Sequence, residues 1–150
     1  MENQMAYRVT AAWDGEGNGR VSADEMSPTI HFSTPPEFHG DPGYWTPDHF
    51  LLAAVASCYM TTFHVLAEMS ALEFLGMGLL AEGKMGLPDG NWRFTEIVLK
   101  PMLTIAASLD RALADHLLEK ALQECRIARC LVFPVRLEPV VQLAQELLAS

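Results

Sequence analysis

The chain has 150 residues, of which half are hydrophobic and 19% are charged. This length suits one domain with its own hydrophobic core, and the apolar content is too high for a disordered chain. Nineteen acidic residues against ten basic ones give a net charge of −9, which opposes binding to phosphate backbones and to anionic lipid. We therefore expect a single domain over residues 1–150 that binds neither nucleic acid nor membranes.

The amino-terminal segment, residues 1–13, has no basic region followed by an apolar stretch, so it does not resemble a secretory signal. The longest apolar run, residues 50–63, is shorter than the roughly 20 residues that span a bilayer. The three cysteines are too few and too unevenly spaced for a secreted disulfide scaffold, and neither a CxxC pair nor an HExxH motif indicates a metal site. These features predict a cytoplasmic protein without a bound metal.

The first three predicted strands are residues 7–13, 19–25 and 29–33. A glycine-rich turn and a Met-Ser-Pro break separate them, which favours an antiparallel meander. Residues 33–45 follow with three prolines and two glycines, so this segment is expected to be a loop, and its aromatic residues suggest that it packs against something.

A long helix is predicted to begin directly after this loop. Thr46 suits the N-cap, Pro47 the first helical position, and Asp48 places a carboxylate where the helix dipole favours it. From there to about Ser70 the segment is apolar on nearly every face, which is typical of a central helix covered on all sides. A chain of this size with few other helices cannot easily supply that cover, so we expect a homodimer.

Two long strands, residues 72–87 and 91–105, are predicted to form a hairpin around Pro88-Asp89-Gly90. Pro101 is expected to mark an edge or a bulge, because proline lacks the N–H that a central strand position donates.

The remaining elements are an amphipathic helix over residues 108–125, a last strand over residues 130–141, and a short helical tail over residues 142–150. Cys125 lies at the end of the amphipathic helix.

Cys58, in the middle of the apolar helix, is the first candidate for chemistry. A thiol there is either an inert small hydrophobic side chain or a nucleophile kept dry until its substrate arrives. The local sequence favours the inert interpretation, because free cysteine is among the most buried residue types. A second cluster, Cys125-Arg-Ile-Ala-Arg-Cys130, raises the prior for redox chemistry in a reducing compartment.

The order of these motifs resembles the OsmC/Ohr family, the osmotically inducible protein C and organic hydroperoxide reductase group. The sharpest match is Pro47 at the start of a helix, the acidic Asp48 after it, and Cys58 ten residues further on in an alanine-rich run. The second match is Cys-x-x-small-Arg, from Cys125 to Arg129. The resemblance implies an α+β OsmC-like fold, in which antiparallel sheets wrap central helices in an intertwined homodimer with active sites near the subunit interface.

The activity that the resemblance implies is a thiol-dependent peroxidase that protects against organic hydroperoxides. In this family the cysteine that matches Cys58 attacks the peroxide and becomes a sulfenic acid. The cysteine that matches Cys125 then forms a disulfide with it, and an external dithiol of the lipoyl or thioredoxin type reduces the disulfide. The reaction uses no metal, haem or flavin.

The resemblance also implies an arginine held by the helix-opening acid, which lowers the pKa of the reactive thiol. The candidates are Arg20 and Asp48, although the family has glutamate at the acidic position. Met60 and Phe63 are candidates to line the path of the peroxide beside Cys58.

A different class of function is a non-catalytic protein on the same fold that binds an apolar small molecule in the dimer cleft. In that case the cysteines are structural remnants, Asp48 complements only the helix dipole, and Arg20 is a solvated turn residue. Arg126 and Arg129 are either cations of the kind that is favoured near a helix C-terminus, or they lower the pKa of Cys125. The aspartate in place of glutamate favours this second function, whereas retention of both cysteines favours the enzyme.

Overall fold

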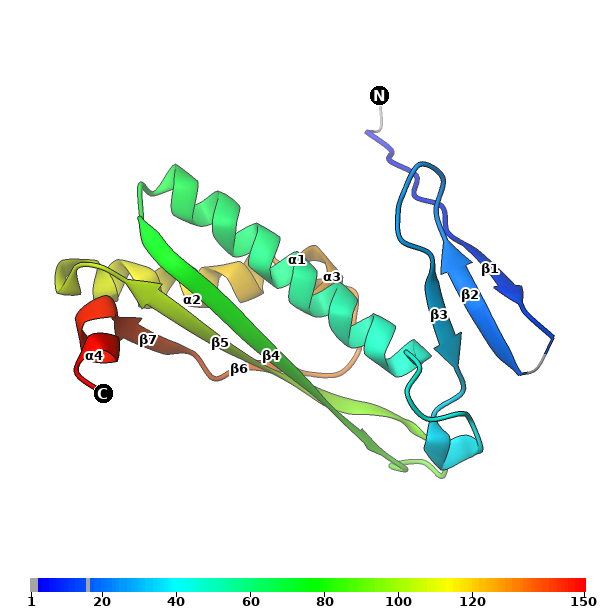
Figure 1. The fold of residues 1–150 in the computed structure, drawn as a ribbon. Coiled ribbons are helices and arrows are strands. Elements are labelled where there is room, and N and C mark those ends of the chain that lie inside the picture. Colours follow the sequence, from blue (N-terminus) through cyan, green and yellow to red (C-terminus); the bar gives the residue numbers. More distant parts are fainter. Residues whose placement is uncertain (1–2, 16) are drawn as a thin grey trace. The chain divides into compact units, whose positions relative to one another are not determined.

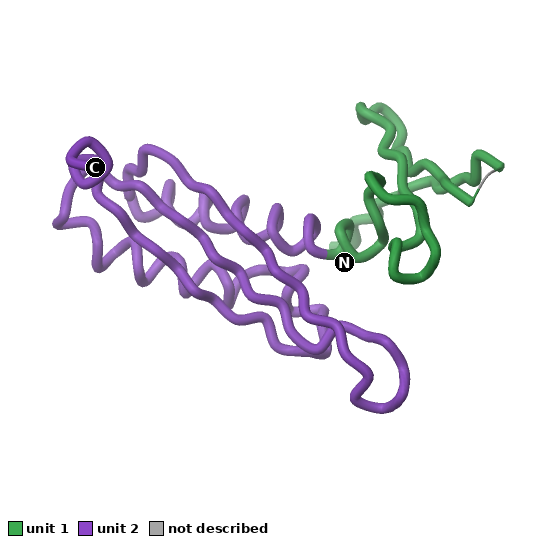
Figure 2. Tube along the Cα trace, turned by 60° about the horizontal axis from the view of Figure 1, so that its bottom comes forward, with its two compact units in different colours: residues 1–51 green, residues 52–150 purple. Residues whose placement is uncertain are grey.

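The computed structural model describes residues 3–15 and 17–150 (Figure 1). Met1 and Glu2 of the amino-terminal segment, and Glu16 of the predicted glycine-rich turn, lie outside the described residues. The chain forms two compact units, residues 1–51 and 52–150 (Figure 2), and each is described by itself. The single domain expected from chain length stays a prediction.

The first unit contains a three-stranded antiparallel sheet in the order β1-β2-β3, so the predicted meander is confirmed. The strands are β1 (Thr10–Trp13), β2 (Asn18–Ser22) and β3 (Ile30–Ser33). The loop after β3 contains a 3-10 turn, η1 (Pro36–Phe38). Its end returns to β3, where the N–H of Ser33 donates to the carbonyl of Trp45 at 2.8 Å.

Helix α1 (Pro47–Met69) begins where the sequence predicts. The N–H of His49 donates to the hydroxyl of Thr46 at 3.4 Å, so Thr46 is the N-cap. The helix ends with Ala71 at φ 52°, and the N–H of Leu72 donates to the carbonyl of Ala67 at 2.9 Å. This is the pattern of a Schellman motif, with alanine at the left-handed position that glycine usually occupies.

Only one face of α1 is buried within the chain. The buried residues are Val55, Cys58, Tyr59, Phe63 and Ala67, and the opposite face exposes Ser57, Thr61, His64, Val65 and Glu68. By length and composition alone this 23-residue helix, which contains an 18-residue window with a mean hydropathy of 1.7, could cross a membrane, although the apolar run 50–63 suggested a shorter segment. One such helix is weak evidence, because the core helix of a soluble protein passes the same test.

The second unit is built on a sheet in which β5 is the central strand. A hairpin joins β4 (Phe74–Gly86) to β5 (Arg93–Ile105), as predicted, and Gly90 turns the chain at φ 84°. Two short strands, β6 (Val135–Leu137) and β7 (Val140–Leu143), pair with the other edge of β5 in parallel.

Pro101 lies in β5, so the prediction of an edge or a bulge at this position is wrong. It pairs with Leu79 in regular register, and the register shifts of this hairpin lie elsewhere. Pairing with β6 ends at Leu99, and pairing with β7 begins at Met102. Because the chain changes partner strand at this point, the missing N–H of proline costs no ladder hydrogen bond.

The prediction of one strand over residues 130–141 is also wrong. A short helix, α3 (Arg126–Arg129), precedes this segment, and the segment itself divides into β6 and the start of β7. Pro139 separates the two strands, because proline has no N–H to donate to the ladder. The carboxyl-terminal helix α4 (Ala144–Leu148) is shorter than the predicted tail.

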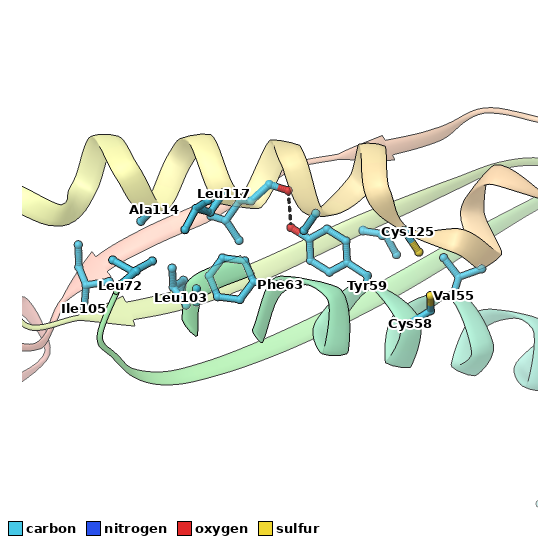
Figure 3. Packing of buried hydrophobic residues seen from close by; sticks show 14 of the residues in the cluster. Val55, Cys58, Tyr59, Phe63, Leu72, Leu103, Ile105, Ala114, Leu117 and Cys125 are labelled. Carbon is cyan, nitrogen blue, oxygen red and sulfur yellow. Dashed lines mark hydrogen bonds between the residues drawn. The ribbon is translucent and has the colours of Figure 1, made fainter. Parts of the chain in front are cut away.

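Helices α1 and α2 (Arg111–Glu124) cover one face of this sheet and form the hydrophobic core with it (Figure 3). The sheet contributes the residues of β5 that point to this face, chiefly Ile97, Leu99, Leu103 and Ile105, all fully buried. The helices contribute Tyr59, Phe63, Leu117 and Leu118 among others. A two-layer α+β architecture therefore confirms the predicted fold class.

Candidate functional site

Cys58 and Cys125, far apart in the sequence, meet in the interior of the second unit. Cys58 lies on the buried face of α1 and is 9% exposed, and Cys125 joins the end of α2 to the start of α3 and is 0% exposed. Both are free thiols. Figure 3 shows the two sulfurs facing each other across the gap between α1 and the end of α2, and each thiol influences the pKa of the other.

The pKa of Cys58 results from opposing effects. Burial acts to raise it, because a charged sulfur is less stable away from water. Hydrogen bonds to the sulfur act in the opposite direction and hold the pKa of Cys58 below its ordinary value. Their donors are the backbone N–H of Ile127, the thiol of Cys125, the hydroxyl of Thr62 and the backbone N–H of Arg126.

The pKa of Cys125 moves in the opposite direction. Burial is the largest influence and raises it, and the adjacent Cys58 sulfur raises it further. Hydrogen bonds from the backbone N–H groups of Ala128 and Ile127 oppose this rise without cancelling it. The arrangement therefore favours a thiolate at Cys58 that accepts a hydrogen bond from a protonated Cys125.

The backbone donors come from the first turn of α3. The N–H groups that open a helix have no partner within that helix, so they are free to bond other groups. Cys125 precedes this turn with an extended backbone, φ −65° and ψ 107°. Its conformation directs the chain so that the amides of Arg126 and Ile127 reach the Cys58 sulfur.

Tyr59, next to Cys58 on α1, joins the two helices that carry the cysteines. Its hydroxyl donates to the carbonyl of Leu118 on α2 at 2.9 Å, and the contact is fully buried (Figure 3). Burial raises the pKa of Tyr59, followed by the negative charge of Glu119, so the phenol stays neutral. This bond helps to fix the distance between α1 and α2, and with it the separation of the two sulfurs.

The predicted activating pair lies in the first unit. Arg20 is exposed on β2, where it pairs with Ala12 and His31. Asp48 is half-buried in the first turn of α1. Within residues 3–15 and 17–150, no ion pair joins these two side chains.

The other predicted site residues lie along α1. Met60 is half-buried, Phe63 is fully buried, and both pack in the hydrophobic core, where the ring of Phe63 meets Phe74 edge-on at 5.4 Å. Cys130 is exposed, and its thiol donates to the carbonyl of Arg126 at 3.3 Å. In the part of the chain that the structure describes, no group of three or more His, Cys, Asp or Glu side chains could hold a metal ion.

Sequence reasoning did not identify two kinds of group that lower the pKa of Cys58. One is the pair of backbone amides in α3, which no side-chain pattern encodes. The other is Thr62, and here a signal existed. Residues four positions apart lie on the same face of a helix, so a hydroxyl at this position was within reach of Cys58.

Comparison with known proteins agrees with this fold. The family model described as OsmC-like protein matches residues 39–139. The uncharacterized protein YmaD of Bacillus subtilis (strain 168) is 31% identical over 136 residues, which cover 88% of this chain and 90% of YmaD.

Two solved structures illustrate the structural similarity. An OsmC-like protein of unknown function from Vibrio cholerae has a TM-score of 0.80 at 20% identity, over 91% of this chain and 100% of the other. An organic hydroperoxide resistance protein from Elizabethkingia anophelis, with thiocyanate bound, has a TM-score of 0.74 at 19% identity, over 95% of this chain and 99% of the other. The family match and the similarity to YmaD together show that this chain belongs to the OsmC-like protein family.

Proposed function

We propose that this protein is a cysteine-based peroxidase that reduces organic hydroperoxides, with Cys58 as the peroxidatic and Cys125 as the resolving cysteine. The observation that carries the proposal is the buried pair itself, in which hydrogen bonds favour a thiolate at Cys58 while Cys125 keeps its proton. Family members named organic hydroperoxide resistance proteins support the same class of substrate.

In the first step the Cys58 thiolate attacks the terminal oxygen of the hydroperoxide. A sulfur–oxygen bond forms and the oxygen–oxygen bond breaks, so the sulfur loses two electrons and becomes a sulfenic acid. The leaving alkoxide takes a proton and departs as an alcohol. The lowered pKa of Cys58 supports this role, because only the thiolate is the nucleophile.

In the second step the Cys125 sulfur attacks the sulfenic sulfur of Cys58. The two sulfurs form a disulfide, and the hydroxyl leaves as water after taking the proton that Cys125 carried. The two sulfurs face each other across the gap between α1 and the end of α2 (Figure 3), so a local shift that brings them to disulfide geometry is part of the proposal. An external dithiol of the lipoyl or thioredoxin type then reduces the disulfide and completes the cycle.

The apolar surroundings of Cys58 support a preference for organic peroxides. Val55, Tyr59 and Phe63 are fully buried on the same face of α1, and Met60 is half-buried beside them. A substrate with an alkyl substituent gains about 0.8 kcal/mol for each methylene that it buries. Met60 and Phe63 are therefore proposed to line the path of the peroxide.

Arg20 and Asp48 remain our proposed activating pair, acting in addition to the hydrogen-bond donors of α1 and α3. If Arg20 supplies a cation to Cys58, replacing it with alanine raises the pH at which Cys58 becomes reactive. An unchanged pH profile would assign activation to the hydrogen-bond donors alone.

We also propose that the active form is a cytoplasmic homodimer. The face of α1 opposite the core is open within one chain and includes Val65, which is 51% exposed. A second protomer would cover this face, as expected for a helix with such apolar composition. Light scattering at micromolar concentration tests this, and a stable folded monomer would contradict it.

The decisive experiment measures dithiol-dependent consumption of a bulky organic hydroperoxide. Cys58→Ser should abolish consumption, whereas Cys125→Ser should allow one oxidation event and then stop turnover. Cys130→Ser is the matched control and should behave as wild type. Mass spectrometry after mild peroxide treatment should find a Cys58–Cys125 disulfide.

Two results would contradict the proposal. One is a Cys125–Cys130 disulfide with Cys58 unmodified. The other is a wild-type protein that consumes no peroxide with either class of dithiol, which would leave a non-catalytic protein that binds an apolar small molecule as the better interpretation.

A further inference from the structure

The backbones that carry Cys58 and Cys125 are held in place very differently. Both residues are free thiols, and their sulfurs face each other across the gap between α1 and the end of α2 (Figure 3). In a disulfide the two sulfurs lie about 2.05 Å apart, so one backbone or the other has to shift when the bridge forms. The contacts on each side show which of them can.

The Cys58 side is anchored in the hydrophobic core. Val55 and Phe63, on the same face of α1, are fully buried. Tyr59, next to Cys58, donates its hydroxyl to the buried carbonyl of Leu118 at 2.9 Å. A shift of this turn would open a close-packed core and leave that carbonyl without its donor. Helix α1 is therefore the costly side to move.

The Cys125 side is a junction between two helices. The side chain of Cys125 is fully buried, but its backbone is not helical, with φ −65° and ψ 107°. Its N–H donates to the carbonyl of Leu122 over a long 3.3 Å, and its carbonyl accepts from the N–H of Arg129 at 3.1 Å. Few backbone bonds of the regular helical kind therefore hold this residue.

Helix α3, which follows the junction, is itself weakly held. Its four residues are too few for a helix that is stable without packing. Ala128 is half-buried against the core, whereas the other three residues are exposed. The chain is anchored again at Pro134, whose carbonyl accepts from the N–H of Ile97 on β5 at 3.1 Å. A displacement can therefore be confined to residues 125–133.

We propose that α3 is a redox-responsive segment: formation of the Cys58–Cys125 disulfide draws Cys125 toward α1 and opens the turn of α3, while α1 stays in place. The two thiols lose two electrons and two protons, which the hydroperoxide of the proposed function takes up as it becomes an alcohol and water. The bond from the Arg129 N–H breaks, because its acceptor carbonyl moves with Cys125. Ile127 and Val132, which are 37% and 95% exposed, then present a different surface in the oxidised protein. The inference rests on the disulfide of the proposed function.

The test measures hydrogen exchange by mass spectrometry in the reduced protein and in the protein oxidised with diamide. Diamide is an azo compound that takes up two electrons and two protons from a pair of thiols, so it forms disulfides without any peroxidase activity. In the reduced protein the N–H groups of Arg129, Cys130 and Leu131 donate to carbonyls of the 125–133 segment. Oxidation should make these groups exchange about tenfold faster, whereas the α1 peptide around Cys58 should keep its exchange rate.

Two variants assign the change to this bridge. Cys125→Ser cannot form it, so exchange in α3 should be the same before and after diamide. Cys130→Ser keeps the bridge and should show the wild-type change. Unchanged exchange in α3 of the oxidised wild type, or faster exchange in α1 in its place, would overturn the proposal.

A matched pair of glycine substitutions tests which side moves. Ala128 in α3 and Ala56 in α1 are both half-buried, and each lies within three residues of its cysteine. Glycine weakens a helix relative to alanine, so Ala128→Gly should speed disulfide formation by diamide about fivefold. Ala56→Gly should leave the rate unchanged. Equal rates for Ala128→Gly and wild type, or acceleration by Ala56→Gly, would contradict the proposal.

The role of α3 and the peroxidase function can fail separately. A protein that shows the expected exchange after diamide but consumes no hydroperoxide would retain the role of α3 and lose the peroxidase function. A protein that consumes hydroperoxide while exchange in α3 stays unchanged on oxidation would retain the function and lose the role of α3. If diamide forms no Cys58–Cys125 disulfide, the role of α3 is lost as well.

Discussion

The backbone amide of Arg126 can be removed without changing the conformation around it, which makes Arg126→Pro a direct test of the hydrogen bonds to Cys58. This N–H opens α3 and therefore has no partner inside the helix. Proline is well tolerated at the first helical position. The preceding residue, Cys125, lies outside the α region that proline disfavours in its neighbour, with φ −65° and ψ 107°.

The amount by which Arg126→Pro destabilises the Cys58 thiolate depends on the hydrogen-bond donors that remain. A hydrogen bond to a charged group contributes about 1.5 to 3 kcal/mol. Four donors act to lower the pKa of Cys58, and those from Ile127, Cys125 and Thr62 stay in place when the amide of Arg126 is removed. We therefore expect a loss of about 1 kcal/mol in the stability of the thiolate, which is roughly a fivefold lower alkylation rate below the midpoint.

The measurement is the rate of Cys58 alkylation between about pH 5 and 10, a range that extends below and above the ordinary thiol pKa of about 8.5. Because the pKa of Cys58 is lowered in wild type, its rate should already rise below the pH at which an ordinary thiol ionises, and Arg126→Pro should move that rise to higher pH. Arg126→Ala keeps the amide and removes the guanidinium. If Arg126→Ala shifts the profile as much as Arg126→Pro, the side-chain charge is responsible and the reasoning from backbone amides is refuted.

Three further predictions concern the core and the surface. Tyr59→Phe leaves the buried carbonyl of Leu118 without its donor and should lower the free energy of unfolding by about 1 to 2 kcal/mol in urea titrations; an unchanged midpoint would contradict the link between α1 and α2. Phe63→Ala should cost about 3 to 5 kcal/mol, because the ring is fully buried, and a loss below about 1 kcal/mol would show that the core is open there. Glu96 has a pKa lowered to about 2, first by its hydrogen bond to Arg136, so this ion pair favours the folded state above the ordinary carboxyl pKa and loses its effect as the pH falls toward 2. Arg136→Ala should raise the pKa of Glu96 in an NMR titration, and no change would assign the shift to other groups.

Local patterns in the sequence were sufficient to predict much of the fold. The Thr46-Pro47 start of the long helix, the meander of the first unit and the β4–β5 hairpin depend on residues close together in the chain. Caps, turn residues and hydrophobic periodicity act over a few positions, so they can be recognised in the sequence without a structure. The prediction of one strand over residues 130–141 failed for a non-local reason, since Pro139 divides this segment and both halves pair in parallel with β5.

At the candidate site, too, the sequence identified the residues, whereas the tertiary structure decided how they are arranged. The sequence singled out Cys58 and Cys125 as residues and, through a family resemblance, suggested that they act together. Their meeting depends on α1 and α2 packing on one face of the sheet, which is a property of the whole core. The lowered pKa of Cys58 depends in part on backbone amides of α3. Every residue except proline carries such an amide, so its direction in space is decided only by the tertiary structure.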